Sequence, residues 1–221
     1  MPTPIAYLTP DEARALDALV VRLEARTGVQ VVPAVVGKAD SYVEIPWKAF
    51  GLGASFSSLG LVAADRLHPD WVTASTAMTH AVVVLGVAAT CALLTVFASS
   101  FARLFLRRTR ADVEVRQYAE SLFLQRALFA TRARTGLLVL VSLFERRIEI
   151  IADTGFTGRV SAGDWDAVIA TMTPHLRNAH PFEALRDALG AIEALLAAKG
   201  FLPAAGGANE LADTAIQERG Q

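Results

Sequence analysis

The segment LLVLVSLFERRIEIIA, Leu137–Ala152, indicates the fold class of this 221-residue chain. Its first part, Leu137–Phe144, is a nearly continuous apolar run, which is typical of a strand buried on both faces of a sheet. Charged side chains follow at Glu145–Arg147, and Ile148–Ala152 is again rich in β-branched residues. The pattern predicts two strands joined by a tight polar turn.

A further strand is predicted at Val29–Val36, VQVVPAVV. Pro33 interrupts it, and because proline has no backbone N–H to donate, it predicts an edge strand or a bulge. The preceding segment begins with Thr9 and Glu12 in the spacing of a capping box, so we expect a helix from there that ends at Gly28.

Helices are also predicted at Ala111–Arg134, from Ser161 to about Asn178, and at Pro181–Lys199. With the strands they give an α/β protein, a small mixed β-sheet flanked by helices. Residues 203–221 are small and polar, which predicts a disordered tail.

The segment Met78–Ala102 contains 25 residues without a formal charge when His80 is neutral. As a helix it would reach about 37 Å, enough to cross a hydrocarbon core of about 30 Å. The low share of charged residues, 19%, agrees with a chain that is partly outside water. The segment therefore predicts a transmembrane helix over 78–102.

A second span is predicted at about 47–64, because a single span would leave the two halves of the α/β domain on opposite sides of the bilayer. Its glycines and serines would let two helices approach closely. The predicted organisation is a first domain part at 8–44, a transmembrane helical hairpin at 45–106, and a second domain part at 107–202.

Basic residues lie at the outer ends of the predicted hairpin, whereas the connecting loop has Arg66. They are Lys38, Lys48, Arg103, Arg107, Arg108 and Arg110. The positive-inside rule then predicts a cell inner membrane protein with its soluble domain and both termini in the cytoplasm. The expected partners are the lipid bilayer and a membrane protein. Since the formal net charge is only −1, nucleic acid is not expected as a partner.

Four segments together resemble the TPM domain, in its bacterial membrane-anchored form with a hairpin inside the domain. They are EARTGVQVVPAVV (Glu24–Val36), QYAESLF (Gln117–Phe123), TGLLVLVSLFERRIEI (Thr135–Ile150) and DTGF (Asp153–Phe156). The resemblance covers about residues 8–202. It implies an α/β/α sandwich and a membrane-associated role. Members of the family are described as acid phosphatases, as binders of divalent metal ions such as calcium, or as accessory factors of membrane complexes.

Asp40 and Glu145 are candidate ligands of Ca²⁺ or Mg²⁺, because both follow strands and could meet at one rim of the sheet. Arg146 and Arg147 are candidate phosphate-binding residues. The structural alternative is that Asp40 caps the following helix and Glu145–Arg147 form a solvated turn.

A second candidate oxygen cluster comprises Asp153, Thr154 and Asp164, close to a helix start where anions can also bind; helix capping is the simpler account. No phosphate loop, nucleophile elbow or HExxH motif is present. The sequence therefore favours a non-enzymatic accessory or assembly factor for a membrane complex. The alternative is a membrane-tethered, metal-dependent phosphatase that uses Asp40, Glu145 or Asp153.

Overall fold

The computed structural model describes residues 7–69, 75–203 and 214–220 and divides the chain into two compact units. The α/β unit combines Met1–Asp40 with Thr109–Gln221, and the inserted unit is Ser41–Arg108. The chain thus leaves the α/β unit after its first strand and returns to it before its second.

The α/β unit contains a four-stranded mixed sheet in the order β3-β2-β1-β4. Its strands are β1 (Gln30–Lys38), β2 (Gly136–Ser142), β3 (Arg147–Ala152) and β4 (Ile216–Gly220). Both β2 and β4 run parallel to β1, and β3 is antiparallel to β2. Every residue of β2 is buried, which explains its unbroken apolar sequence and confirms the small mixed sheet.

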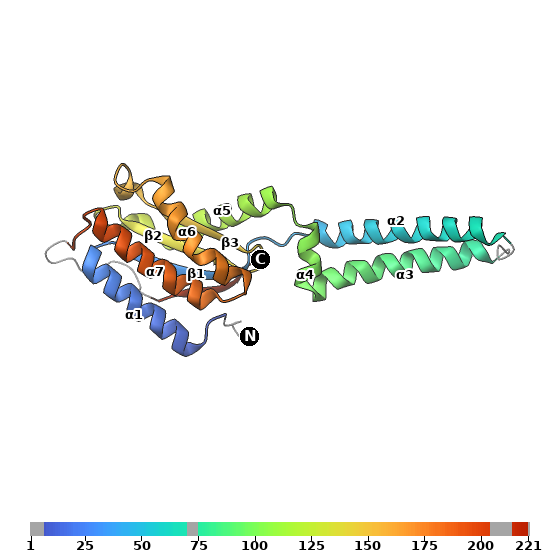
Figure 1. Ribbon diagram of the computed structural model, residues 1–221, viewed down its shortest axis with the longest axis horizontal. Helices are drawn as coiled ribbons and strands as arrows, with labels where there is room; N and C mark the ends of the chain where they lie inside the picture. Colours follow the sequence, from blue (N-terminus) through green and yellow to red (C-terminus); the bar gives the residue numbers. More distant parts are fainter. Residues whose placement is uncertain (1–6, 70–74, 204–213, 221) are drawn as a thin grey trace. The chain divides into compact units, whose positions relative to one another are not determined.

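Helices cover both faces of this sheet (Figure 1). On one face, α1 (Pro10–Thr27), α6 (Ala162–Arg177) and α7 (Pro181–Ala198) enclose a core that takes Val31 and Val35 from β1. On the other, α5 (Arg108–Gln125) covers Val32, Ala34 and Val36. Alternate residues of β1 therefore enter opposite cores, as the period of a strand requires.

Pro33 does not mark an edge strand, because β1 lies between β2 and β4. The amide of Gln30 faces β2 through its bond to Thr135 O, so the amide of Val31 faces the other side, where the Glu24 carboxylate accepts it at 2.9 Å. Pro33 lies two residues further on, on the side of Val31, and pairing with β4 begins only at Ala34. The missing N–H thus falls where no ladder bond is required.

The prediction of a disordered tail is wrong for Ile216–Gly220, which form β4; residues 204–213 and 221 lie outside the described part. This polar strand is held by side-chain contacts as well as by the ladder. The Gln217 side chain accepts hydrogen bonds from the amides of Tyr7 and Leu8, and Asp17 accepts one from Ala215 N. Those partners are some 200 residues away in sequence, so local composition does not reveal them.

In the α/β unit, most helix ends agree with the sequence: Gly28 caps the end of α1, as predicted, and the exception is α5. A capping box opens α1 at Thr9, as predicted, and Ser161, predicted as an N-cap, also forms a capping box at the start of α6. The helix predicted over Ala111–Arg134 instead ends at Gln125, because Ala127 adopts a left-handed conformation and the short 3-10 turn η3 (Leu128–Ala130) follows. A further 3-10 turn, η4 (Thr154–Phe156), follows β3.

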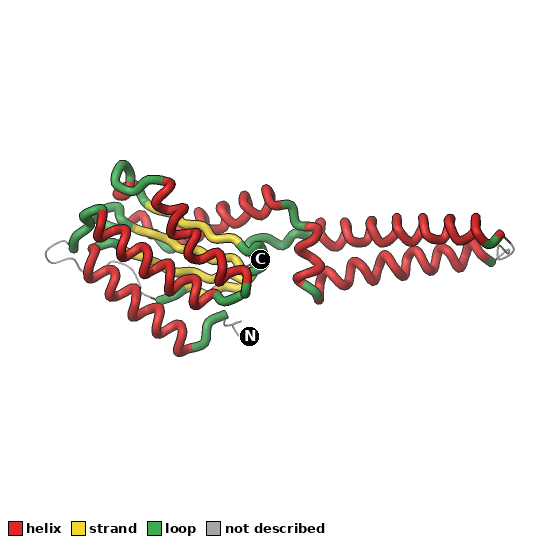
Figure 2. The backbone as a smooth tube through the Cα atoms, viewed as in Figure 1, coloured by secondary structure: helices red, strands yellow, loops and turns green. Residues whose placement is uncertain are grey.

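The inserted unit consists of α2 (Glu44–Leu67), α3 (Thr76–Phe97), α4 (Ser99–Ala102) and the 3-10 turn η2 (Arg103–Phe105). Figure 2 shows α2 and α3 as two long helices side by side. Gly53 allows their close approach, since a Cβ there would lie 3.1 Å from Ala88 Cα. Small-residue packing is thereby confirmed at this position.

The predicted span 78–102 is not one helix. α3 ends at Phe97, where Ala98 takes an extended conformation, and α4 starts again in a new direction. Among the described residues, α3 alone is long and apolar enough to cross a membrane. α2 is as long, but Glu44, Lys48, Asp65 and Arg66 make it less apolar.

Candidate functional site

A polar cavity of about 530 Å³ lies at the carboxyl ends of β1 and β4, next to α5. This is the edge at which open α/β sheets bind ligands. Ala39 and Asp40, which follow β1, line it together with Glu218, Arg219 and Gly220 of β4. The residues from α5 recur at helical spacing and form one face of that helix: Glu114, Gln117, Tyr118, Ser121, Leu122 and Gln125.

Arg110 joins two carboxylates that line this cavity. Its guanidinium lies 2.9 Å from Asp40 Oδ2 and 3.5 Å from Glu114 Oε1. Asp40 therefore belongs to an ion-pair network with α5. It does not cap α2, whose N-cap is Val43.

At the opposite wall, the Tyr118 hydroxyl donates to Glu218 Oε2 at 2.6 Å, and Arg126 donates to Glu218 Oε1 at 3.0 Å. Burial, and then the hydrogen bond to the Glu218 carboxylate, raise the pKa of Tyr118 above its ordinary value. The phenol therefore stays protonated and donates. These contacts also fasten β4 to α5.

Glu145, the predicted partner of Asp40, has a different role. It is buried, and its two oxygens accept hydrogen bonds from the backbone N–H of Ala39, at 2.9 Å, and from the hydroxyl of Ser142. Glu145 thus connects the β2–β3 turn to the end of β1. It does not line the cavity.

The two candidate phosphate-binding arginines lie at the β2–β3 turn. Arg146 has a positive φ of 53°, as the turn requires, and Arg147 forms an ion pair with Asp112 of α5. The turn comprises residues 143–146, and β2 ends at Ser142 because Leu143 and Phe144 donate their amides to β1.

The second candidate cluster is divided between two local structures. Asp153 is buried and forms a bidentate ion pair with Arg134, at 3.0 and 2.9 Å, while also capping the amide of Thr154. Asp164 belongs to the capping box of α6 and lies 2.7 Å from Lys199 Nζ. The hydrogen bond from Lys199, followed by those from Ser161, lowers the pKa of Asp164 to about 2.

The predicted residues thus do not form one site. Within the described ranges, no three His, Cys, Asp or Glu side chains group closely enough to hold a metal ion. Of the candidates, Asp40 lines the cavity. The residues missed from the sequence are those of α5 and β4. The polar spacing of Glu114, Gln117, Ser121 and Gln125 on a predicted helix is the signal that could have found these four.

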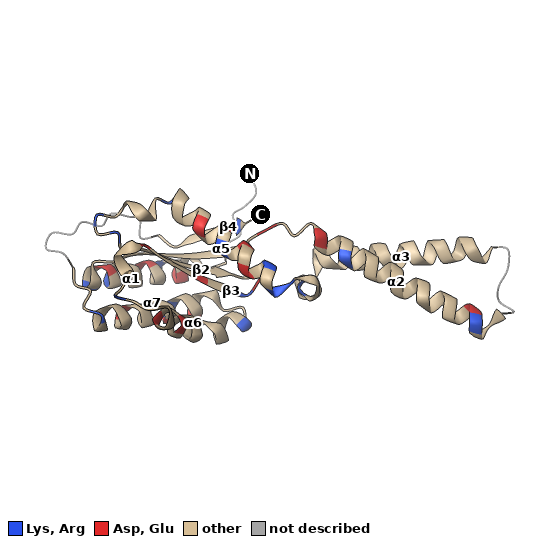
Figure 3. Ribbon diagram, turned by 90° about the horizontal axis from the view of Figure 1, so that it is seen from above, with Lys and Arg blue, Asp and Glu red and all other residues tan. Residues whose placement is uncertain are grey.

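The inserted unit presents a second surface with a distinct chemistry. Only 11% of the most apolar 18-residue stretch of α3 is buried, whereas the core helix of a soluble protein is mostly buried. Figure 3 shows α3 without charged residues and α2 with charges confined to its ends. The exposed apolar side chains include Leu52, Phe56, Leu59, Val62, Val82, Leu85, Leu93 and Val96.

The comparisons with known proteins agree with this fold. No curated protein matches the sequence significantly. The NMR structure of BA42 protein from the psychrophilic bacterium Bizionia argentinensis is similar over 98% of this chain and 99% of its own, with a TM-score of 0.56 and 14% identity, which indicates a shared fold. Residues 100–195, which include α5, β2, β3, α6 and most of α7, match the model of the TPM domain family.

Proposed function

We propose that this chain is a TPM-type protein of a bacterial inner membrane, anchored by α2 and α3, and that it acts as an accessory or assembly factor for a membrane complex. The observation that carries the anchoring is the exposure of α3. A 22-residue helix reaches about 33 Å, the thickness of a hydrocarbon core, and apart from the side that packs against α2 it is mostly exposed.

The connectivity of the sheet supports two spans. β1 precedes the inserted unit and β2 follows it, yet the two strands pair from Gln30 to Val36. The chain must therefore return to the side of the membrane from which it departed. If α3 crosses the bilayer, α2 is the segment that crosses it in the other direction.

The proposed orientation rests on the positive-inside rule. Lys38 precedes α2 and Lys48 lies near its start, and Arg103, Arg107 and Arg108 follow α3. The α/β unit and both termini then face the cytoplasm. A fluorescent reporter after Gln221 should be bright in the cytoplasm; a signal confined to the periplasm would contradict the orientation.

Anchoring is tested by alkaline carbonate extraction of membranes from cells that express the full chain. The protein should stay with the membrane pellet, since a spanning helix cannot be released by high pH and salt. Release into the supernatant would refute the anchor. For the accessory role, purification from membranes should recover a specific membrane protein in stoichiometric amount, and a preparation with none would count against it.

A ligand-binding or phosphatase function is the second candidate, and the cavity favours it because Asp40, Glu114 and Glu218 line it together. Hydrolysis of p-nitrophenyl phosphate with and without Ca²⁺ or Mg²⁺ would test it. Activity lost in Asp40→Asn and kept in Glu120→Gln, which changes an exposed carboxylate of α5 outside the cavity lining, would support an enzyme. Equal turnover in both variants would exclude the cavity as its site.

A further inference from the structure

The end of the inserted unit where α2 begins and α3 finishes differs from the rest of that unit in both shape and chemistry. α3 stops at Phe97 although neither proline nor glycine follows, and α4 and η2 carry the chain across the end of the helix (Figure 1). Within ten residues, Ser99–Arg108 contains three arginines and four large apolar side chains. Such a short segment is too polar to continue the span.

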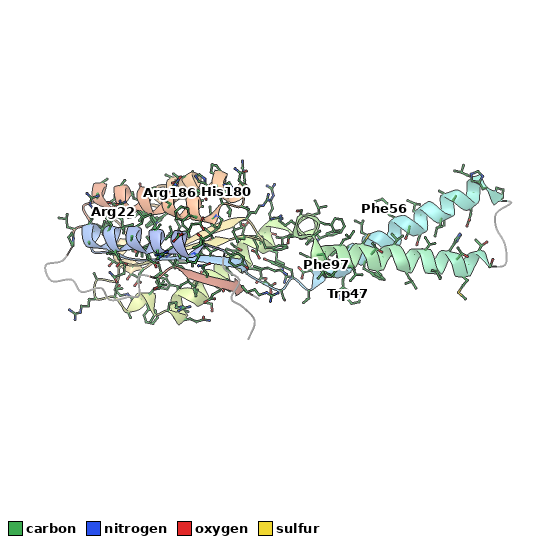
Figure 4. The ribbon with its side chains drawn as sticks, turned by 90° about the horizontal axis from the view of Figure 1, so that it is seen from below. Arg22, Trp47, Phe56, Phe97, His180 and Arg186 are labelled. Atoms are coloured by element: carbon green, nitrogen blue, oxygen red, sulfur yellow. The ribbon has the colours of Figure 1, made fainter. Side chains whose placement is uncertain are left out.

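Aromatic side chains gather at this end and remain uncovered. Trp47 is 73% exposed and Phe97 is 83% exposed, and Figure 4 shows both at the same end of the helix pair, away from Phe56. Trp47 also makes an edge-on contact with Phe50, at a centroid distance of 6.1 Å. Exposed aromatic rings at one end of an apolar helix pair are typical of the level of lipid headgroups.

Basic side chains share this end. Arg107 and Arg108 are exposed, and neither has an ion pair with a carboxylate of the described residues. Lys48 Nζ reaches the carbonyl oxygen of Phe105 at 3.5 Å, which joins α2 to η2. Glu44 is the acidic residue at this end, within 3.7 Å of Lys48.

Among the described residues, the other end of the helix pair has no such surplus of basic side chains. There Asp65 lies 3.5 Å from His80, and Arg66 is the basic residue at the end of α2. The two ends of the helix pair are separated by about 33 Å, the length of α3, so each falls at one boundary of a bilayer core. The electrostatic difference between them is therefore a difference between two membrane surfaces.

We propose that Trp47, Phe97, Arg103, Leu104, Arg107 and Arg108 form a collar that lies at the headgroup level of one leaflet and binds the phosphates of anionic phospholipids. The inference rests on the proposed membrane anchoring and adds the partner: a lipid with net negative charge, held at this end of the inserted unit. The aromatic and leucine side chains enter the acyl boundary, and the guanidinium groups remain with the phosphates.

Native mass spectrometry of the full chain in detergent tests the lipid preference, with equal amounts of phosphatidylglycerol and phosphatidylcholine added. The wild-type chain should retain phosphatidylglycerol in excess. Since each basic residue near an anionic surface contributes roughly a fivefold gain in affinity, Arg107→Gln/Arg108→Gln should lose most of the excess. The pair Arg107→Lys/Arg108→Lys should keep it, which separates loss of charge from damage to the fold.

Arg66→Gln is the matched control, because it removes an exposed arginine from the opposite end of the helix pair and should leave the preference unchanged. Equal retention of both lipids by the wild-type chain, or an excess that survives in Arg107→Gln/Arg108→Gln, would overturn the proposal. Displacement of the lipid by millimolar inorganic phosphate would also overturn it, since the site would then bind free phosphate and not a lipid surface.

A second measurement concerns depth. With Trp71→Phe and Trp165→Phe, Trp47 is the remaining tryptophan, and in vesicles its emission should be quenched more by lipids brominated near the headgroup than by lipids brominated near the chain end. The reverse order would remove Trp47 from the collar. Carbonate extraction separates the two proposals: a chain that stays in the membrane without any lipid preference refutes the collar and leaves the anchor intact.

Discussion

The carboxylate of Glu145 accepts the backbone N–H of Ala39 across 106 positions of sequence, at 2.9 Å. Its second oxygen accepts the hydroxyl of the fully buried Ser142. One side chain thereby fixes the end of β1, just before the chain departs into the inserted unit, against the turn that closes the β2–β3 hairpin.

Replacing Glu145 with alanine should lower the free energy of unfolding by about 3 kcal/mol, because it leaves a buried N–H and a buried hydroxyl without an acceptor. Urea denaturation followed by Trp165 fluorescence, in a Trp47→Phe/Trp71→Phe background, measures the α/β unit. Glu120→Ala, which removes an exposed carboxylate paired with Arg116, should cost less than about 0.5 kcal/mol. Similar losses for both variants would contradict this role of Glu145.

The packing of α2 on α3 predicts a specific cross-link. A Cβ at Gly53 would lie 3.1 Å from the Cβ of Cys91, whereas a Cβ at Gly51 meets no atom within 4 Å. With a slight separation of the helices, Gly53→Cys should form a disulfide with Cys91 on mild oxidation. Intact mass and loss of thiol labelling detect it. The control variant Gly51→Cys should keep both thiols; cross-linking there would show a different packing of the helices.

The lowered pKa of Asp164 predicts that the stability of the fold depends on pH. Contacts with Lys199 and Ser161 lower its pKa from 3.8 to about 2, so the folded protein holds the charged form more tightly than the unfolded chain does. This contribution is present above about pH 4 and is lost as the pH falls toward 2. The difference in urea midpoint between wild type and Asp164→Asn should therefore shrink over that range. Lys199→Met should weaken the same dependence, and a constant difference in midpoint would refute it.

The hydrogen bond from Tyr118 to Glu218 should contribute to the stability of β4 in the sheet. Tyr118→Phe removes the 2.6 Å hydrogen bond to Glu218, worth about 1.5 kcal/mol because the acceptor is charged. Hydrogen exchange of the β4 amides should become roughly tenfold faster, with little change in β2. Ser121→Ala, on the same face of α5, is the control and should leave exchange of β4 unaltered. Unchanged β4 protection in Tyr118→Phe would mean that the ladder alone holds the strand.

The sequence predicted the sheet best where burial is continuous. The apolar run of β2 has one structural solution, a strand covered on both faces, and the capping boxes at Thr9 and Ser161 are local interactions that four residues specify. The end of α5 was missed because Ala127 is a good helix former by propensity, yet adopts φ 51° in this fold.

The candidate site was predicted less well for a physical reason. Asp40, Glu145, Asp153 and Asp164 have the chemistry of metal ligands, but all four are taken up by partners that only the tertiary structure supplies or by local caps. The contribution of Glu218 to the cavity could not be predicted, because β4 has a polar sequence that resembles a disordered tail. Its partners, Tyr118 and Arg126, are on another element.

The parallel pairing of β4 with β1 also imposes an order on biosynthesis. β1 is made before the inserted unit, while both strands that flank it, β2 and β4, are made after it. While α2 and α3 emerge from the ribosome, β1 has no neighbour in the sheet. The two helices of the inserted unit are thus made, and can pack against each other, before the α/β unit is complete. The sheet is complete only after β4 has been made.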